Sequence, residues 1–304
     1  MKRILVQVLT ALMILSMSLI STNTYVFANM SQNELFVHFI DVGQGDSILI
    51  VTPDQETILI DGGETAGGRI VADYLRSLNI DAIDFMIATH PHADHINGLT
   101  VVLNQFEVRN IYAPRVSHTT VAYRNFLTAI QNQGLTIKNV TYGVTLPIES
   151  IFATFVGPVR EYGTNLNNWS AVLHITHGEN TFIFTGDVER TSELDMINVH
   201  GNTMQADVLK VSHHGSNTST TQEFLDVVRP SIAVIQVGRN SFGHPTPQVL
   251  DRLEQIGAAV YRTDFHGTIV IISDGYQLEI RTGISNFDGE VSLEGETYLE
   301  EIYY

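Results

Sequence analysis

The sequence contains no cysteine, and its 16 lysine and arginine residues are outnumbered by 33 aspartate and glutamate residues. Without cysteine there is no disulfide, no thiolate metal ligand and no cysteine nucleophile, so nitrogen ligands for a metal ion must come from the 12 histidines. The formal net charge of −17 argues against a broad surface that binds polyanions nonspecifically, although it leaves room for a local groove. Hydrophobic residues make up 44% of the 304-residue chain, which excludes intrinsic disorder and allows a sizeable core.

Beyond its N-terminus the chain also lacks an apolar run long enough to span a membrane. At the N-terminus, Lys2 and Arg3 precede an apolar run from Ile4 to Ile20, and Val26-Phe27-Ala28 offers small residues for cleavage. This pattern predicts a secretory signal peptide over 1–28, with an uncleaved membrane anchor as the alternative. Cleavage takes the formal charge from −17 to −19, because both lost charges are positive. We therefore expect a secreted or extracytoplasmic protein with no stable membrane insertion after cleavage.

Short apolar runs alternate with helix-like patterns in both halves of the chain. The runs that predict strands are 35–41, 47–51, 57–60, 85–89, 171–175, 181–185, 208–211, 232–237, 258–262 and 267–272. Helices are predicted over 69–78, 121–131 and 246–256. Two halves that each mix strands and helices predict an α/β fold of four layers (αββα), with two mixed sheets face to face and helices outside. We expect one such domain over 29–283 and an acidic, solvated tail over 284–304.

The strongest chemical signal is the run Thr89-His90-Pro91-His92-Ala93-Asp94-His95, which leaves the carboxyl end of an apolar strand, where α/β proteins place their sites. In an extended loop, His90 and His92 direct their imidazoles to the same side, and Pro91 favours that conformation. Asp94 is predicted as the N-cap of the helix that follows. Three imidazoles and a carboxylate within six residues form a donor set suited to Zn²⁺, Mn²⁺ or iron.

Three later segments add to this signal. Thr185-Gly186-Asp187 follows an apolar strand, where one carboxylate could bridge two ions; alone, it reads as a simple turn. Ser212-His213-His214-Gly215-Ser216 also follows a strand and could supply a ligand to a second ion. Phe242-Gly243-His244-Pro245 precedes a helix, so His244 is a candidate contact for a phosphate or leaving group, or else a structural loop histidine.

These motifs, in this order, resemble the metallo-β-lactamase superfamily. They are most similar to the hydrolase domain at the C-terminus of ComEC-type competence proteins and its free-standing relatives. The segments that carry the resemblance are Phe39-Ile40-Asp41-Val42-Gly43-Gln44-Gly45-Asp46-Ser47, Ile60-Asp61-Gly62-Gly63, the run 89–95, Asn167-Asn168-Trp169-Ser170, 185–187, 212–216 and Gly243-His244-Pro245. The resemblance implies a binuclear metal-dependent hydrolase with two divalent ions, Zn²⁺ or Mn²⁺.

The resemblance also implies a role for each matching residue. The first ion would be held by His90, His92 and Asp187, and the second by Asp94, His95, Asp187 and His213. We prefer His213 to His214 because it lies nearer the strand end. Asp61 is expected to orient the histidine loop from behind the ligands. Asn168 stands where many members of the superfamily supply a third histidine, which implies a weaker first site.

Two ions held in this way would share a water and lower its pKa. Asp94 is then expected to orient that water, and His244 or His214 to stabilise the leaving oxygen.

The resemblance favours a phosphodiesterase, with DNA as one expected substrate. The charge of the mature chain favours a smaller extracellular phosphodiester, such as a cell-wall phosphocholine group, because only 14 lysine and arginine residues remain after cleavage. A catalytically weak metal-binding protein is a third interpretation, suggested by Asn168. Hydrolysis of carboxylic esters or β-lactams is less favoured, because the closest motifs belong to phosphodiesterases.

Overall fold

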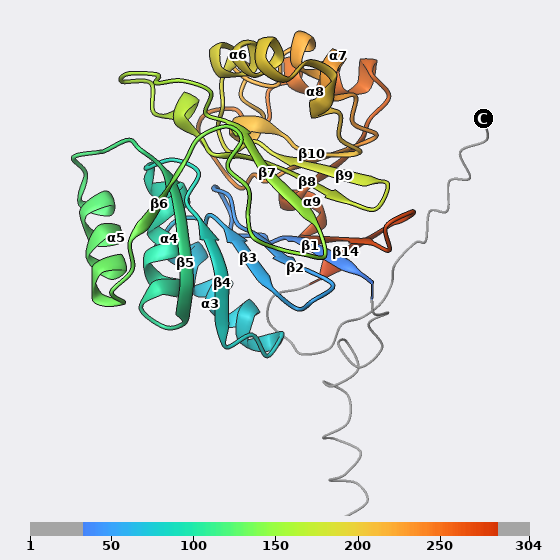
Figure 1. Ribbon diagram of the computed structural model, residues 1–304. Helices are drawn as coiled ribbons and strands as arrows, with labels where there is room; N and C mark the ends of the chain where they lie inside the picture. Colours follow the sequence, from blue (N-terminus) through green and yellow to red (C-terminus); the bar gives the residue numbers. More distant parts are fainter. Residues whose placement is uncertain (1–32, 285–304) are drawn as a thin grey trace, which may run out of the picture.

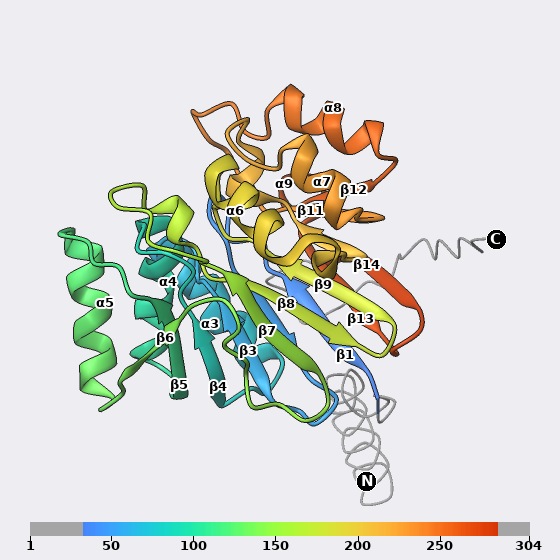
Figure 2. The same ribbon diagram turned by 45° about the horizontal axis from the view of Figure 1, so that its top comes forward.

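The computed structural model describes residues 33–284. The predicted signal peptide (1–28) and the predicted acidic tail lie outside the described residues, apart from Ile284 at the end of the last strand. The described chain forms two β-sheets packed face to face, with helices on both outer surfaces (Figures 1 and 2). This arrangement confirms the predicted α/β fold of four layers.

The first sheet has eight strands. In spatial order they are β14 (Leu278–Ile284), β13 (Thr268–Ser273), β1 (Leu35–Phe39), β2 (Ile48–Val51), β3 (Thr57–Ile60), β4 (Ala82–Ile87), β5 (Glu107–Pro114) and β6 (Ile137–Val140). Neighbouring strands from β3 to β6 are parallel, and the others are antiparallel. The parallel strands are connected by α3 (Thr65–Ser77), α4 (Ala93–Leu103) and α5 (Val121–Asn132).

The second sheet has six strands. They are β12 (Ala259–Arg262), β11 (Ile232–Ile235), β10 (Val208–Lys210), β9 (Asn180–Phe184), β8 (Val172–His177) and β7 (Phe152–Gly157). Its parallel strands are connected by α6 (Arg190–His200), α7 (Gln222–Val228) and α8 (Pro247–Gln255). Short helical segments complete the described chain: η1 (Asn167–Trp169), η2 (Gly201–Met204), η3 (Ser212–Gly215) and α9 (Thr263–His266). No helix within residues 33–284 combines the length and the hydropathy needed to cross a bilayer.

Three apolar clusters hold the layers together. The cluster between the two sheets includes Phe39, Phe155 and Phe184, which are at most 1% exposed. A second cluster packs α3, α4 and α5 on the eight-stranded sheet, and a third packs α6, α7 and α8 on the six-stranded sheet. Because strands such as β11 are buried on both faces, they are apolar along their whole length, which is why continuous apolar runs predict them.

Most predicted elements are present, with ends that differ by a few residues. β4 ends at Ile87, so residues 88 and 89 lie beyond the strand and not within it as predicted. α4 begins after an N-cap at His92, which corrects the predicted N-cap at Asp94. Asp94 lies instead in the first turn of α4, where the helix dipole favours a carboxylate.

Six of the longer elements are not predicted from the sequence: β5, β6, β7, β14, α6 and α7. In α6 only Ser192, Glu193 and Met196 are buried, so its apolar periodicity is weak. β7 alternates exposed and buried residues at its start but is buried at its end. These elements are fixed by packing against their neighbours more than by local pattern.

Phe155 and Phe152 offer a test of the core, because they share strand β7 but differ in burial. Phe155 is 0% exposed and stacks on Tyr112, with ring centroids 6.0 Å apart, whereas Phe152 is 60% exposed. We expect Phe155→Ala to lower the free energy of unfolding by about 3–5 kcal/mol, and Phe152→Ala to change it by less than about 0.5 kcal/mol. Equilibrium unfolding in urea measures both, and equal losses would contradict the packing described here.

Candidate metal centre

The predicted site segments converge at one edge of the paired sheets. Each follows the carboxyl end of a strand: Asp61 follows β3, His90 follows β4, Asp187 follows β9, and His213 and His214 follow β10. Parallel pairing brings the ends of β3 and β4 together, and likewise those of β9 and β10. A hydrogen bond from the backbone N–H of Ala171 to the carbonyl of Thr89 (2.9 Å) joins the two groups across the sheets.

Glycines allow the histidine loop to lie close to the turn after β3. A Cβ atom on Gly98 of α4 would lie 1.7 Å from the carbonyl oxygen of Gly62, so no other residue fits there. The backbone N–H of Gly62 donates to the carbonyl of His95 (2.9 Å), and that of Gly98 donates to the carbonyl of Gly63 (2.8 Å). This contact fixes the first turns of α4, and with them the positions of Asp94 and His95.

Asp61 orients two of the predicted ligands. Its buried carboxylate accepts hydrogen bonds from the Thr89 N–H (2.8 Å), the Thr89 hydroxyl (2.6 Å) and Nδ1 of His95 (2.8 Å). Since the Thr89 hydroxyl donates to Asp61, it accepts from Nδ1 of His90 (3.1 Å). In both rings, Nδ1 therefore carries the proton and is the hydrogen-bond donor. When a ring is neutral, its Nε2 lone pair then faces the centre. Burial would lower the pKa of His95, but Asp187, Asp61 and Asp94 raise it well above its usual value, so a cation would have to displace a proton from this ring.

A buried donor set lies in front of Asp61. Asp94, His95, Asp187 and His214 each offer a ligand atom, and these atoms all lie within 4.8 Å of one another. Nε2 of His95 is 3.3 Å from Oδ2 of Asp187, and Nε2 of His214 is 3.4 Å from Oδ2 of Asp94. Nε2 of His95, Nε2 of His214 and Oδ1 of Asp187 are buried without a hydrogen-bond partner among the described residues. Such atoms are rare in native proteins, and together they form the nitrogen and oxygen set that a divalent cation requires.

His90 and His92 lie beside this group. Nε2 of His90 is 3.8 Å from Oδ2 of Asp187 and 2.9 Å from Nδ1 of His92, to which it is hydrogen-bonded. The rings of His90 and His95 are adjacent, with centroids 4.2 Å apart. Oδ2 of Asp187 therefore lies within 4 Å of Nε2 of His90 as well as of Nε2 of His95 and His214.

The structure brings His214, and not His213, into the buried group. His214 is 2% exposed, whereas the His213 side chain is 22% exposed and its Nε2 lies 3.8 Å from Oδ2 of Asp187. Both residues have left-handed backbone conformations, with φ of 51° and 52°, so the chain turns sharply after β10. The His214 ring is thus buried and the His213 ring lies at the edge of the group, but their Nε2 atoms are 3.7 Å and 3.8 Å from Oδ2 of Asp187, so the ligand role of His213 stays a prediction.

Two charged residues behind His214, Asp46 and Lys210, have a role that was not predicted from the sequence. Nδ1 of His214 donates to the carbonyl of Gln236 (3.0 Å) and lies 3.2 Å from Oδ1 of Asp46. The buried Lys210 forms an ion pair with Asp46 and donates to the carbonyl of Gly186 (3.1 Å). A charged residue within the apolar run 208–211 was the available signal for Lys210, because a lysine is almost never buried without a partner.

Electrostatic interactions within the cluster decide which groups carry protons. Burial would raise the pKa of Asp187, but His95 and His214 hold it well below its usual range. Burial would lower the pKa of His214, but Asp187, Asp46 and Asp94 together raise it to about 10. The pKa of His90 is lowered well below its usual value by burial, so this ring is neutral and ready to act as a ligand.

Asn168 has a structural position behind the centre. Its side-chain oxygen accepts hydrogen bonds from the backbone N–H groups of Glu189 (3.0 Å) and Ser192 (3.2 Å) at the start of α6. The neighbouring Ser170 accepts from the Asp187 N–H (3.1 Å), and its hydroxyl lies 3.4 Å from Nδ1 of His90. The segment that lacks the third histidine thus holds the turn containing Asp187.

His244 lies at the rim of the centre. Its ring centroid is 5.6 Å from that of His213 and 5.7 Å from that of Phe242. Burial, followed by the nearby His213 and His214, lowers the pKa of His244, which keeps the ring neutral near pH 7. His244 is thus placed near the centre, as predicted, but outside the buried donor set.

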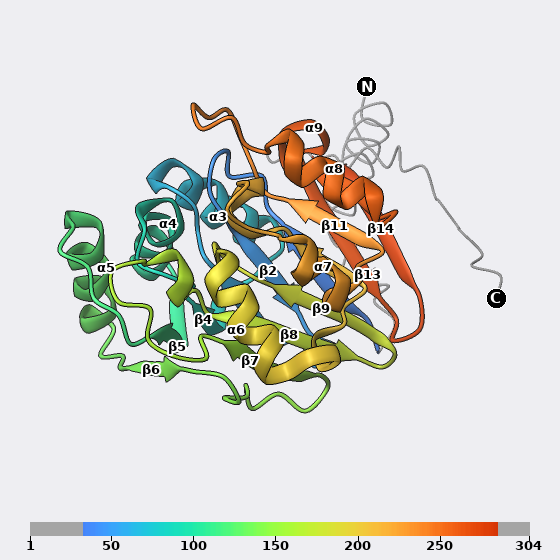
Figure 3. The same ribbon diagram turned by 90° about the horizontal axis from the view of Figure 1, so that it is seen from above.

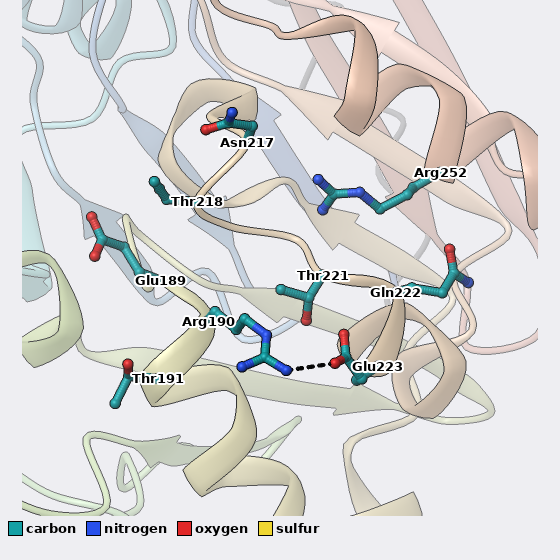
Figure 4. A pocket seen from close by; sticks show the side chains of 9 residues that line it. All are labelled: Glu189, Arg190, Thr191, Asn217, Thr218, Thr221, Gln222, Glu223 and Arg252. Carbon is teal, nitrogen blue, oxygen red and sulfur yellow. Dashed lines mark hydrogen bonds and ion pairs between the residues drawn. The ribbon is translucent and has the colours of Figure 1, made fainter.

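A groove of about 560 Å³ opens beside the centre, between α6, α7 and α8 (Figure 4). Arg190 and Arg252 line it together with polar and acidic side chains, and Arg190 pairs with Glu223 at 2.8 Å (Figure 4). At one end, the Thr218 hydroxyl lies 3.4 Å from Nδ1 of His213. The groove therefore begins at the rim of the metal centre.

A buried carboxylate, Glu193, holds one wall of this groove. It accepts hydrogen bonds from the Thr220 N–H (2.5 Å), the Thr221 N–H (3.0 Å) and the Thr221 hydroxyl (2.7 Å). On the other side of the same loop, Arg252 donates to the carbonyls of Ser219 (3.0 Å) and Thr220. These contacts fix the loop that follows η3.

The fold and this site define an αββα protein with a cluster of histidine and aspartate side chains that could hold a metal ion. The sequence pattern of the metallo-β-lactamase superfamily matches residues 40–239. The chain therefore belongs to this superfamily, whose members are generally metal-dependent hydrolases. Among solved structures, the metallo-β-lactamase fold protein YhfI from Bacillus subtilis has a TM-score of 0.53 at 13% identity, covering 79% of this chain and 100% of that chain.

The curated relatives agree with the predicted resemblance. The chain is 33% identical over 251 residues to ComE operon protein 3 of Bacillus subtilis (strain 168). It is 28% identical over 270 residues to Recombination protein 2 of Haemophilus influenzae (strain ATCC 51907 / DSM 11121 / KW20 / Rd). These alignments cover 77% and 86% of this chain but only 32% of each relative, so the chain spans about a third of their length. The predicted similarity to ComEC-type competence proteins is confirmed.

The role of Asp61 can be tested against a matched aspartate. Asp207 accepts hydrogen bonds from the N–H (2.7 Å) and the hydroxyl (2.8 Å) of Thr181, as Asp61 does from Thr89. Asp207 precedes β10, however, and so lies at the edge of the sheet away from the site. We expect Asp61→Asn to weaken Zn²⁺ or Mn²⁺ binding about 10- to 100-fold, because His95 and His90 lose their orientation. Asp207→Asn should leave it unchanged. Competition titration with a chelator measures both, and equal affinities for the two variants would contradict this role.

Glu193 gives a pH prediction. Burial raises its pKa to about 7 from an ordinary 4.5, against the lowering effect of the Thr221 and Thr220 hydrogen bonds and Arg252. The folded state then binds more protons than the unfolded state, so stability falls as the pH rises from about 4.5 to about 7. Glu193→Gln removes the titrating carboxyl group, and with it this loss of stability. We expect the free energy of unfolding of the variant, relative to the wild type, to increase by about 3 kcal/mol across that window. Parallel pH curves in urea unfolding would show that Glu193 does not titrate in this way.

Proposed function

We propose that this protein is a metal-dependent phosphodiesterase that uses two divalent cations. The observation that carries the proposal is the set of buried, unpartnered ligand atoms on His95, His214 and Asp187, with Asp187 also facing His90. An arrangement with one carboxylate between two ligand groups suits a pair of cations better than a single ion. Bound cations would supply charge neutralisation and an ionised water at neutral pH.

The proposed ligands revise the sequence prediction at one position. The first group consists of His90, His92 and Asp187. The second consists of Asp94, His95, Asp187 and His214, with His213 at the rim. His214 replaces His213 because its unpartnered Nε2 is buried among the other donors. Asp61 and Asn168 act from behind the ligands, the first on the imidazole rings and the second on the turn that carries Asp187.

The chain's own side chains have separate roles in this proposal. The Asp94 carboxylate is 32% exposed and so can accept a proton or a hydrogen bond from a water at the open side of the centre. His244 is neutral near pH 7, so its ring N–H can donate to the leaving oxygen. Lys210, buried beside Asp46, balances the negative charge that the carboxylates bring to the centre.

Two substrates compete. DNA is supported by the similarity to ComE operon protein 3 and to Recombination protein 2, and by the two arginines in the adjoining groove. A smaller extracellular phosphodiester, such as a cell-wall phosphocholine group, is supported by the formal charge of −17. A metal-binding protein without catalysis is disfavoured, because the segment around Asn168 is fully integrated into the hydrogen bonds of the centre.

Hydrolysis of bis(p-nitrophenyl) phosphate tests the proposed activity. We expect turnover with Mn²⁺ or Zn²⁺ that EDTA abolishes. Asp187→Ala and His214→Ala should each reduce turnover by at least about 100-fold, because each removes a ligand, whereas His213→Ala should have a smaller effect. Asp207→Asn serves as the control for folding. Full activity of Asp187→Ala would refute the binuclear mechanism, and a greater loss in His213→Ala than in His214→Ala would refute the ligand assignment.

A further inference from the structure

A large aromatic side chain is exposed beside the metal centre. Phe242 is 71% exposed and lies in the segment 236–246 between β11 and α8. This segment, drawn in orange in Figure 3, projects from the body of the molecule. A phenylalanine on such a projection contributes little to the core and presents an aromatic face to the solvent.

Internal hydrogen bonds hold the segment in one conformation. The Asn240 side chain donates to the carbonyls of Gly238 (2.9 Å) and His244 (2.8 Å). Its oxygen accepts from the backbone N–H groups of Phe242 (3.0 Å) and His244 (3.1 Å). Gly243, which follows Phe242, has a φ of +77° that favours glycine. The ring is therefore presented at the tip of an ordered turn.

Both ends of the segment are fixed to the metal centre. At one end, a Cβ atom on Gly238 would lie 2.4 Å from the carbonyl carbon of Gly43, so the chain touches the turn that leads to Asp46. At the other end, the Thr246 N–H donates to the carbonyl of Gly215 (2.9 Å), directly after His214. The position of Phe242 relative to the ligands is thus fixed.

A series of rings leads from the centre to Phe242. Nε2 of His213 lies 3.8 Å from Oδ2 of Asp187. The ring centroids of His213 and His244 are 5.6 Å apart. Those of His244 and Phe242 are 5.7 Å apart, and the two ring planes are tilted by 30°. A group bound on Phe242 would therefore be connected to the centre through His244 and His213.

We propose that Phe242 stacks on the nucleobase next to the scissile phosphate, so that the substrate is a single-stranded nucleic acid. This inference rests on the proposed phosphodiesterase function and names its substrate class. A single aromatic face suits a flat, uncharged base, and stacking of this kind is tolerant of sequence. A quaternary ammonium group is disfavoured, because residues 238–245 carry the cation Arg239 and no acidic side chain. Single strands are favoured because the bases of a duplex are already stacked.

Binding of two matched oligonucleotides tests the proposal without requiring turnover. One is a fluorescent single strand of thymidines, and the other has the same backbone with its central bases removed. We expect the intact strand to bind the Ca²⁺-loaded wild-type protein about five- to 100-fold more tightly than the abasic strand, by fluorescence anisotropy. Phe242→Ala should lose this preference, Phe242→Tyr should keep it, and the duplex should bind less tightly than the single strand.

Phe152→Ala is the matched control, because Phe152 is also an exposed phenylalanine (60%) but starts β7 at the end away from the site. It should bind both strands as the wild type does. Equal binding of intact and abasic strands by the wild type, absence of binding, or an unchanged preference in Phe242→Ala would each overturn the proposal. Competition by phosphocholine that depends on Phe242 would overturn it in favour of the ammonium ligand.

The two proposals fail separately. Base-dependent binding without hydrolysis of bis(p-nitrophenyl) phosphate would reject the phosphodiesterase function while supporting the role of Phe242. Metal-dependent hydrolysis without base-dependent binding would support the phosphodiesterase function and reject the role of Phe242.

Discussion

The geometry of the metal centre depends on the buried carboxylate of Asp61. It accepts a hydrogen bond from His95 directly, and it orients His90 through Thr89. These contacts decide which nitrogen of each ring carries the proton. An imidazole can bind a cation only through a nitrogen without a proton, so this control of tautomers precedes any control of distance. The left-handed conformation of Asp61 (φ 56°) is held by the strand on one side and by the glycine turn on the other.

The centre is built from two halves of the chain that are packed by different means. The loops after β3 and β4 are locked by backbone contacts that only glycine permits, as at Gly62 and Gly98. The loops after β9 and β10 are held instead by buried charge, with Lys210 between Asp46 and the carbonyl of Gly186. Removal of one partner from such a buried pair leaves an uncompensated charge, so these residues support the centre, and Oδ1 of Asp46 is itself buried without a hydrogen-bond partner among the described residues.

The fold and most of the centre are predictable from the sequence because their signals are local. Continuous apolar runs mark strands buried on both faces, and the spacing of His90, His92, Asp94 and His95 places four donors in one loop. The choice between His213 and His214 is not local, because two consecutive left-handed residues reverse the direction expected at a strand end. The roles of Asp46 and Lys210 were not predicted for the same reason: their importance lies in a contact between segments 164 positions apart in the chain.

The two loops that surround the opening contribute none of the proposed ligands. The segment with Phe242 is stabilised by Asn240, and the wall of the groove is stabilised by Glu193 and Arg252, each independently of the histidine loop. The segment with Phe242 nevertheless joins two proposed roles, because Asn240 also holds the backbone of His244 in the same turn. Since the carbonyl of Gln236 accepts from His214 and the Thr246 N–H donates to Gly215, a change in the length of this segment would disturb the proposed ligand His214 together with the proposed base contact.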